Sequence, residues 1–283
     1  MDRDRDDRPL VPRLEPVPGA PLLLVRAGEP LLVASDVHLG LALPTPRAPR
    51  SEAGSAPRLA SGFLEASKRT GARRVLLLGD VKDPIRGLPR HIRSEVDEFF
   101  GRLLVGGLSV EVVLGNHDVG LTRALPAAVS VHPADGLLRE GVGYFHGHAW
   151  PAKAILRRAG VLVAGHLHPG FRLAPSPERA RTGKEPCWVR TLMRPLTPAE
   201  RRRKGQHPPP RAREMIVLPA YNPLCASEAL NREEPRRGHR FLVRRFLARG
   251  VSRAYLLDGT DLGELHWDLP PTTRGSAPGA SLA

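Results

Sequence analysis

Five short apolar segments of the chain each run directly into side chains that can bind a metal ion. Apolar runs of this length are typical of buried β-strands, so the polar groups stand at strand carboxyl ends. Binding sites in open α/β sheets form beyond these ends, where the loops of several strands meet. We therefore expect one shared site. Its candidate residues are Asp36, His38, Asp80, Asn116, His117, Asp118, His146, His148, His166 and His168.

The candidate residues supply a mixed set of oxygen and nitrogen donors. Carboxylates, imidazoles and an amide oxygen suit Mn²⁺, Fe or Zn²⁺ better than Ca²⁺, which prefers oxygen ligands alone. The set is also larger than one tetrahedral ion can use. A carboxylate bridging two ions about 3.5–4 Å apart would use the surplus, and such ion pairs serve phosphoester hydrolysis. We therefore predict two divalent transition-metal ions, with Mn²⁺ preferred and Fe or Zn²⁺ as alternatives.

Each motif has an ordinary structural explanation when it is taken alone. An aspartate at a strand end commonly caps a helix, and an isolated histidine is more often a surface or core residue than a ligand. Five motifs in order, each at a strand end, favour the shared metal site, because structural context is what confirms a motif. The histidines without such context are given no role. They are His91, His132, His207, His239 and His266.

The elements that must position these residues follow from hydrophobic spacing. Strands are predicted over residues 22–25, 31–34, 75–78, 110–114, 142–145, 161–164 and 215–218, with a terminal hairpin over 255–259 and 263–267. Helices are predicted over residues 59–68, 92–103, 151–158 and 241–247. Glycines stand beside the motifs at 79, 115, 147 and 165. They allow the loops to turn sharply and the backbone to approach a ligand.

Composition divides the rest of the chain. Residues 1–20 are charged and proline-rich and are predicted to be a disordered tail, as are residues 270–283, which leaves residues 21–269 as the domain. Residues 174–214 are rich in arginine and proline and are predicted to be an exposed insertion. The insertion is either an arm that binds nucleic acid or a solvated loop.

The composition of the 283-residue chain indicates a packed and strongly basic protein. Hydrophobic residues make up 41% and charged residues 25%, which excludes global disorder. The net charge of +14 attracts polyanions, so a nucleic-acid partner is permitted, but the arginine excess of GC-rich coding explains the charge equally well. Aromatic residues make up only 5%, which argues against an aromatic platform for single strands.

Cysteine usage and apolar run length exclude further classes of protein. Cys187 and Cys225 are the only cysteines and form no CxxC pair, which excludes a disulfide framework and a zinc site built from cysteines. No apolar run approaches the roughly 18 residues of a membrane span. The charged first residues lack the apolar segment of a signal peptide. We therefore expect a cytoplasmic protein with no membrane partner.

The order of the motifs resembles that of the calcineurin-like metallophosphoesterases. The family pattern of D-x-H, GD, GNHD, H and GHxH is matched in full over residues 30–170. The resemblance implies an α/β fold, a four-layer α/β/β/α sandwich of two mixed sheets flanked by helices, and hydrolysis of a phosphoester. It also implies that Asp36, His38 and His168 hold one ion, that Asn116, His146 and His166 hold a second, and that Asp80 bridges them.

The same resemblance implies roles for the remaining candidates. His117 would contact the phosphoryl group and help the leaving oxygen depart. Asp118 would orient His117 through its other ring nitrogen. The fourth motif contains two histidines on the same side of an extended chain, and the family ligand is usually the one directly before Gly. His146 is therefore the expected ligand, and His148 is expected to line the substrate pocket or to be structural.

A narrower resemblance is to the DNA-ligase-associated phosphoesterases of bacteria and to archaeal proteins related to DNA-repair nucleases. It covers residues 20–232, apart from the insertion, and is carried by segments at 78–83, 145–149, 164–169 and 217–223. The lipid-A-precursor pyrophosphatases share the same metal motifs. The resemblance therefore implies a phosphodiesterase or phosphomonoesterase, including one in DNA repair. The alternatives are a small-molecule, nucleotide or lipid diphosphate hydrolase and a non-catalytic metal-binding partner in a DNA-repair assembly.

Overall fold

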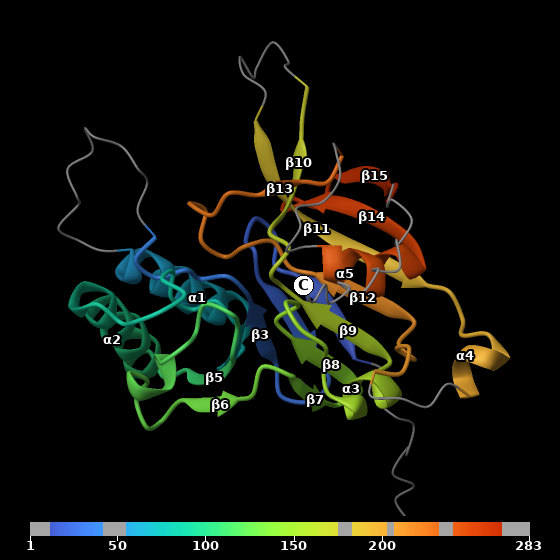
Figure 1. Ribbon diagram of the computed structural model, residues 1–283. Helices are drawn as coiled ribbons and strands as arrows, with labels where there is room; N and C mark the ends of the chain where they lie inside the picture. The colour runs from blue at the N-terminus through green and yellow to red at the C-terminus, as the bar shows by residue number, and fades with distance from the viewer. Residues whose placement is uncertain (1–11, 42–54, 175–182, 203–206, 232–239, 268–283) are drawn as a thin grey trace, which may run out of the picture.

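Two β-sheets packed face to face form the centre of the molecule, and helices cover the outer face of each sheet (Figure 1). The computed structural model describes residues 12–41, 55–174, 183–202, 207–231 and 240–267. The layers run helix, sheet, sheet, helix, which confirms the predicted α/β/β/α sandwich of two mixed sheets. Within the described residues, no helix is both long enough and apolar enough to span a membrane.

The first sheet contains the strands that carry the first three motifs. Its strands, in spatial order, are β1 (Arg13–Pro16), β2 (Leu23–Arg26), β3 (Leu31–Ala34), β4 (Arg74–Leu78), β5 (Ser109–Val113) and β6 (Ser130–His132). Strands β1 to β3 pair antiparallel, whereas β3 to β6 are parallel, so β3, β4 and β5 end at the same edge. Helices α1 (Ala56–Thr70) and α2 (Arg90–Val105) cover the outer face.

The second sheet contains the strands that carry the last two motifs. Its strands are β7 (Leu137–Arg139), β8 (Val142–Phe145), β9 (Val161–Ala164), β10 (Pro169–Arg172), β11 (Lys184–Met193), β12 (Glu214–Val217), β13 (Glu228–Ala229), β14 (Gly250–Leu256) and β15 (Asp261–Leu265). Their order is β13-β10-β11-β12-β9-β8-β7, and β14 pairs with β11 and β15. Strands β8, β9 and β12 are parallel.

Short helices complete the second half of the molecule. Helices α3 (Lys153–Arg158) and α5 (Arg240–Arg245) and the 3₁₀ turn η2 (Leu247–Arg249) pack on the outer face of the second sheet. Helix α4 (Pro198–Arg202) and the 3₁₀ turn η1 (Leu121–Arg123) lie in connections. The predicted helices and strands are thus confirmed with bounds shifted by a few residues, except that the first strand of the predicted terminal hairpin, 255–259, shares only residues 255 and 256 with β14.

Three apolar layers hold the four structural layers together. The central strands are buried on both faces, and successive side chains point to opposite faces. In β4, Val75 and Leu77 pack on the helical side, whereas Leu76 and Leu78 lie in the layer between the sheets. Strands that are buried on both faces are therefore expected to be continuous apolar runs. The parallel strands β3, β4 and β5 all end at the same edge of their sheet.

The predicted disordered tail over residues 1–20 is wrong in its last part. Residues 13–16 form β1, which pairs with β2 so that Leu14 stands opposite Val25. Val17 follows and is buried. Charge and proline content dominated the prediction, whereas pairing with an existing sheet edge supplies the backbone hydrogen bonds that a tail lacks. Residues 1–11 and the predicted tail over 270–283 lie outside the described residues.

The predicted exposed insertion over residues 174–214 is also wrong over much of its length. Residues 184–193 form β11, which pairs with β10, β12 and β14 inside the second sheet. Cys187 and Val189 are buried on the outer face, and Trp188 lies between the sheets. The prediction relied on the count of basic residues and therefore missed that successive side chains of β11 face opposite sides of the sheet. Residues 175–182 and 203–206 lie outside the described residues.

A charged cluster links the two sheets through Glu111 of β5. Arg139 on β7, in the second sheet, donates to both oxygens of Glu111, at 2.8 and 2.7 Å. Arg74 on β4 donates at 3.1 Å, and Nε2 of His132 on β6 lies at 2.8 Å. The hydrogen bonds from Arg139 are the main cause that lowers the pKa of Glu111 from 4.5 to about 2, against the opposing effect of burial.

The lowered pKa predicts a pH-dependent contribution to stability. It is fully present above about pH 4.5 and is lost as the pH falls toward 2, because the unfolded chain takes up the proton first. We expect Glu111→Gln to lower the free energy of unfolding by about 1–3 kcal/mol at pH 7 and by much less near pH 2, as measured by urea titration.

Glu98→Gln is the matched control, because Glu98 also pairs with an arginine, Arg102, but on the exposed side of α2. Its effect should stay within about 0.5 kcal/mol. Equal losses in the two variants at pH 7 would contradict a link between the sheets through Glu111.

Candidate metal centre

The loops that follow β3 and β4 lie side by side at the carboxyl edge of the first sheet. The backbone N–H of Asp36 donates to the carbonyl of Gly79 at 3.1 Å, and the N–H of His38 donates to the carbonyl of Asp80 at 2.9 Å. The parallel pairing of β3 with β4 therefore continues beyond the strand ends. It places the two candidate carboxylates on adjacent segments of chain.

The second sheet brings its own strand ends to the same place. The N–H of His166, just after β9, donates to Oδ2 of Asp36 at 3.0 Å. After β12, the N–H of Tyr221 donates to the carbonyl of Ser35 at 2.8 Å, and Ala220 pairs with Ser35 in an isolated parallel bridge. The site thus lies where the carboxyl edges of the two sheets meet.

Backbone strain is concentrated on the candidate ligands. Six non-glycine residues of the described chain have positive φ, and five of them are candidate ligands. This left-handed region is rare for residues with a Cβ, although Asp and His enter it more readily than most. Such residues cost about 1–3 kcal/mol each, and they cluster at functional sites. The five are Asp36 (61°), His38 (42°), Asp80 (51°), His166 (68°) and His168 (44°).

Asp80 lies at the centre of the candidate site and is 2% exposed. Its Oδ1 accepts a hydrogen bond from the backbone N–H of His117 at 2.8 Å. Its Oδ2 faces three imidazoles, with Nε2 of His146 at 3.2 Å, Nε2 of His38 at 3.8 Å and Nε2 of His117 at 3.9 Å. One carboxylate oxygen is therefore close to side chains from both sheets.

Two of the groups of donor atoms that could hold a metal ion share Asp80. Within each group, every ligand atom lies within 4.8 Å of the others. The first group is Asp36, His38 and Asp80, and the second is Asp80, His146 and His166. His168 adjoins the first group, because its Nε2 lies 3.0 Å from Oδ1 of Asp36. A carboxylate common to two groups is the arrangement expected of a bridging ligand.

Several donor atoms of the site are buried without a hydrogen bond, although Oδ1 of Asp36 and Nε2 of His146 have ion-pair contacts with His168 and Asp80. They are Oδ1 of Asp36, Nε2 of His38, Oδ1 of Asn116 and Nε2 of His146. Buried polar atoms are nearly always satisfied in folded proteins, so this cluster indicates a place for a cation. Nδ1 of His146 is engaged by the carbonyl of Leu78 at 2.7 Å, which leaves Nε2 toward Asp80. The donor set therefore fits a transition-metal ion.

The histidines keep both aspartates ionised. Burial is the largest influence and raises the pKa of each carboxyl, but neighbouring charges outweigh it. His168 contributes most to holding the pKa of Asp36 far below its usual range, and His146 contributes most to holding that of Asp80 at about 2. Burial favours neutral His146, yet Asp80 raises its pKa to about 9. Both carboxylates therefore carry the negative charge that a cation requires.

The predicted contact between Asp118 and His117 is wrong. Oδ1 of Asp118 accepts from the N–H of Val81 at 2.9 Å, and Oδ2 accepts from the N–H of Gly115 at 2.8 Å. The tight turn from Gly115 to Asp118 folds this carboxylate back onto the first residue of the turn. Asp118 therefore ties the loop after β5 to the loop after β4 and does not orient His117.

The loop after β4 holds His117 instead. The carbonyl of Asp83 contacts Nδ1 of His117. A carbonyl only accepts hydrogen bonds, so Nδ1 carries the proton and Nε2 is left on the side of Asp80. The fully buried Lys82 donates from Nζ to the carbonyls of Pro84 and of His117, the latter at 2.5 Å. The side chain of His117 stays 23% exposed, so a substrate can reach its ring.

The two histidines of the fourth motif occupy different positions. His146 is fully buried and belongs to a ligand group, whereas His148 belongs to none among the described residues. The ring of His148 lies 5.3 Å from that of His146 and 6.1 Å from that of His166. Burial, with His146, lowers the pKa of His148 to about 4. The geometry favours His146 as the ligand, and a role for His148 in the substrate pocket stays a prediction.

Sequence reasoning missed Asn222, which supports the first ligand turn. Asn222 is 1% exposed, and its Nδ2 donates to the carbonyls of Val37 and His38 at 3.0 and 3.2 Å. It lies in the loop after β12, just beyond the predicted strand over 215–218. The rule that located the other candidates, a polar group after an apolar run, would have found it if applied to this sixth strand end.

Comparisons with known proteins add little to this geometry. No protein-family model and no curated protein matches the sequence. The solved structure of the nuclease MPE from Pseudomonas putida is similar with a TM-score of 0.48 and 17% sequence identity, over 88% of this chain and 100% of that chain. A TM-score below 0.5 does not establish a shared fold, so the function proposed below rests on the site itself.

Gly79 lies so close to His146 and Gly115 that a side chain at this position should disturb metal binding. A Cβ at this position would lie 2.7 Å from Nδ1 of His146 and 2.7 Å from Cα of Gly115, and φ is +73°. We expect Gly79→Ala to displace His146 and to weaken Mn²⁺ binding by about 10–100-fold, measured by titration of the purified protein.

Gly71→Ala is the matched control. Gly71 has nearly the same φ, +75°, but nothing lies within 4 Å of the added Cβ. This variant should lose about 1–2 kcal/mol of stability from backbone strain and keep its Mn²⁺ affinity. Equal Mn²⁺ affinity in the two folded variants would show that Gly79 is not needed to place His146.

Proposed function

We propose that this protein is a metal-dependent phosphoesterase that uses two divalent ions to hydrolyse a phosphodiester or a phosphomonoester. The observation that carries the proposal is the place of Asp80, whose carboxylate is common to two buried groups of ligand atoms. Two ions about 3.5–4 Å apart with shared ligands are suited to phosphoester hydrolysis. Mn²⁺ is the proposed metal, with Fe and Zn²⁺ as alternatives.

Each ion has its own ligands besides Asp80 in this proposal. Asp36, His38 and His168 are assigned to the first ion, and Asn116, His146 and His166 to the second. When bound, such ions supply a water of lowered pKa and positive charge against the phosphoryl oxygens. The positive φ at five of these residues supports the assignment, because strained backbone persists where the surrounding structure imposes a functional geometry.

His117 is the proposed catalytic residue. Its Nδ1–H is held by the carbonyl of Asp83, so only Nε2 exchanges a proton with a substrate. Protonation at Nε2 gives an imidazolium that can donate to the leaving oxygen as the ester bond breaks. His117 also distinguishes the proposal from a non-catalytic metal-binding partner, because a partner of that kind would need no proton donor.

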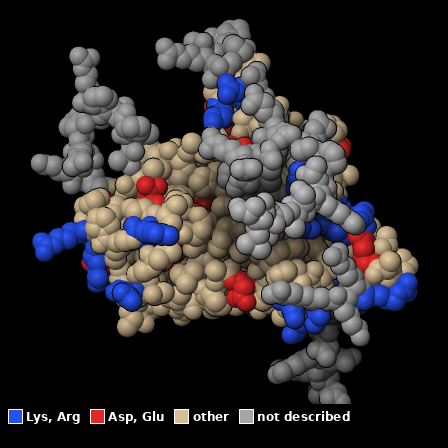
Figure 2. Space-filling view, in the orientation of Figure 1, with Lys and Arg blue, Asp and Glu red and all other residues tan. Residues whose placement is uncertain are grey.

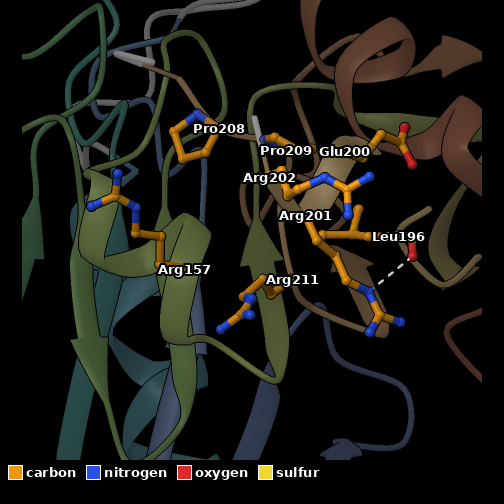
Figure 3. A pocket seen from close by; sticks show the side chains of 8 residues that line it. All are labelled: Arg157, Leu196, Glu200, Arg201, Arg202, Pro208, Pro209 and Arg211. Carbon is orange, nitrogen blue, oxygen red and sulfur yellow. Dashed lines mark hydrogen bonds between the residues drawn. The ribbon is translucent and has the colours of Figure 1, made fainter. Parts of the chain in front are cut away.

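A basic cavity supports a nucleic-acid substrate. The cavity measures about 530 Å³ and is lined by side chains of α3, α4 and the segment that leads to β12. Its arginines are Arg157, Arg201, Arg202 and Arg211 (Figure 3). Glu200 also lines it, but Arg194 pairs with both oxygens of Glu200 at 2.9 Å. Basic side chains gather around α4 at the right of Figure 2. Arginines in this number suit phosphate groups, so we place part of a nucleic-acid backbone here. The cavity lies at the amino ends of β9 and β12, so this backbone would extend across the second sheet to the ligands at the carboxyl ends.

A small-molecule, nucleotide or lipid diphosphate is the alternative substrate. It needs the same metal ligands and the same His117, but it does not need the basic cavity. Single-stranded DNA and bis-p-nitrophenyl phosphate, assayed side by side, distinguish these substrate classes. Cleavage of the small diester alone would favour the alternative.

Metal content tests the phosphoesterase proposal. Wild-type protein loaded with Mn²⁺ should contain about two ions per chain and should lose diesterase activity in EDTA. Asp80→Asn should lose both ions together, because both depend on its carboxylate. His117→Gln should keep its metal content and lose about 10²–10⁴-fold in turnover.

Elemental analysis of the three proteins measures these outcomes. Loss of metal in His117→Gln would show that His117 is a ligand and not the proton donor. One ion per chain in the wild type, or activity that survives EDTA, would overturn the two-metal mechanism.

Salt dependence tests the basic cavity. Replacement of Arg157, Arg201, Arg202 and Arg211 by Ala should reduce the slope of log K against log salt for duplex DNA by about 3–4, since each phosphate contact contributes about 0.9. Hydrolysis of bis-p-nitrophenyl phosphate should not change. Fluorescence anisotropy at a series of salt concentrations measures the slope.

The matched control removes four exposed arginines from α1 and α2, on the other side of the molecule (Figure 1). They are Arg58, Arg69, Arg93 and Arg102. This variant loses the same net charge, so it corrects for the general field of the protein. The same slope in both variants would mean that the cavity makes no specific phosphate contacts and would favour the small-molecule substrate.

A further inference from the structure

Cys225 is a half-buried thiol that no assigned role explains. It lies three residues after Asn222 in the loop that follows β12, and its N–H donates to the carbonyl of Asn222 at 3.0 Å. Asn222 in turn holds the carbonyls of Val37 and His38. The loop that carries the thiol is therefore fastened to the turn that carries the first ligands.

The sulfur of Cys225 faces two of the candidate ligands. One ligand atom each from Cys225, His38 and His168 lie within 4.8 Å of one another. The rings of His38 and His168 are 5.3 Å apart and nearly perpendicular. Donors around one zinc ion, with Zn–S near 2.3 Å and Zn–N about 2.0–2.1 Å, occupy a space of this size.

His38 gives independent support for a ligand at this point. It is 5% exposed, and its Nε2 is buried without a hydrogen bond. The thiol has only a long contact, with Sγ donating to the carbonyl of Asp36 at 3.8 Å. His38 and Cys225 belong to one group of ligand atoms, and a buried imidazole nitrogen and a weakly bonded sulfur are both better satisfied by a cation.

We propose that Cys225 is an additional ligand of the ion held by Asp36, His38 and His168, and that its thiolate makes this position selective for Zn²⁺. The inference rests on the proposed function, since it concerns one of the two ions. Binding forms one sulfur–metal bond and releases the thiol proton to solvent. Thiolate favours Zn²⁺ over the harder Mn²⁺.

The two metal positions are therefore chemically different. The position of Asn116, His146 and His166 offers only nitrogen and oxygen donors, apart from the shared Asp80, and accepts Mn²⁺ as well as Zn²⁺. The position beside Cys225 adds sulfur. Protein given one equivalent of Zn²⁺ and an excess of Mn²⁺ should therefore hold one of each per chain, with Zn²⁺ in the position beside Cys225.

Cobalt substitution tests the sulfur ligand without any assay of activity. Co²⁺ bound to wild-type protein should show the near-ultraviolet charge-transfer band of a thiolate–cobalt bond, saturating with one of the two ions. Cys225→Ser should keep Co²⁺ but lose the band. Cys187→Ala is the matched control, because Cys187 is fully buried against the outer face of the second sheet and should leave the band intact.

X-ray absorption of the zinc-loaded wild type gives a measurement that needs no variant. It should find a sulfur neighbour at about 2.3 Å. Two bound ions with no charge-transfer band and no sulfur neighbour would overturn the role of Cys225 and leave the two-metal phosphoesterase standing. A protein that binds no Co²⁺, Zn²⁺ or Mn²⁺ would overturn both.

Discussion

The buried carboxylate of Asp80 is the constraint on which the rest of the site depends. An ionised group taken out of water is unstable unless hydrogen bonds and opposite charges surround it. The N–H of His117 supplies the hydrogen bond, and the imidazole of His146, from the second sheet, supplies the charge. Asp80 is therefore stabilised only when the two sheets are packed together. The site is therefore complete only when the sandwich is closed.

The turns around Asp80 are held in conformations that their own residues disfavour. Five candidate ligands have left-handed backbones, and Gly79 and Gly165 pass where no Cβ fits. The free energy that holds these residues in left-handed conformations must come from other interactions in the fold. The apolar layer between the sheets and the cluster of Glu111 with Arg139 both join the same two sheets and are available to supply it. Sheet packing therefore imposes the geometry that a cation needs.

The placement of polar residues directly after apolar strands explains why so much of the site could be predicted. A strand buried on both faces must be a continuous apolar run, and the first polar side chains after it necessarily lie at the sheet edge. Asp36, Asp80 and His146 were found in this way, and the two-sheet sandwich followed from a resemblance carried by the same motifs. Charge counting failed for β1 and β11, because the charged residues and prolines of the flanking segments outweighed the short alternation within each strand.

Contacts made across the loops were decided only by the tertiary structure. The sequence places Asp118 next to His117, but a tight turn sends its carboxylate to Gly115, and the carbonyl of Asp83 takes the imidazole instead. Cys225 lies far along the chain from His38, and only the docking of the β12 loop brings the two together. The sequence by itself determined which side chains arrive at the sheet edge, because residue type and apolar spacing are local. Tertiary structure decided their partners, because a partner depends on how loops from two separate sheets pack.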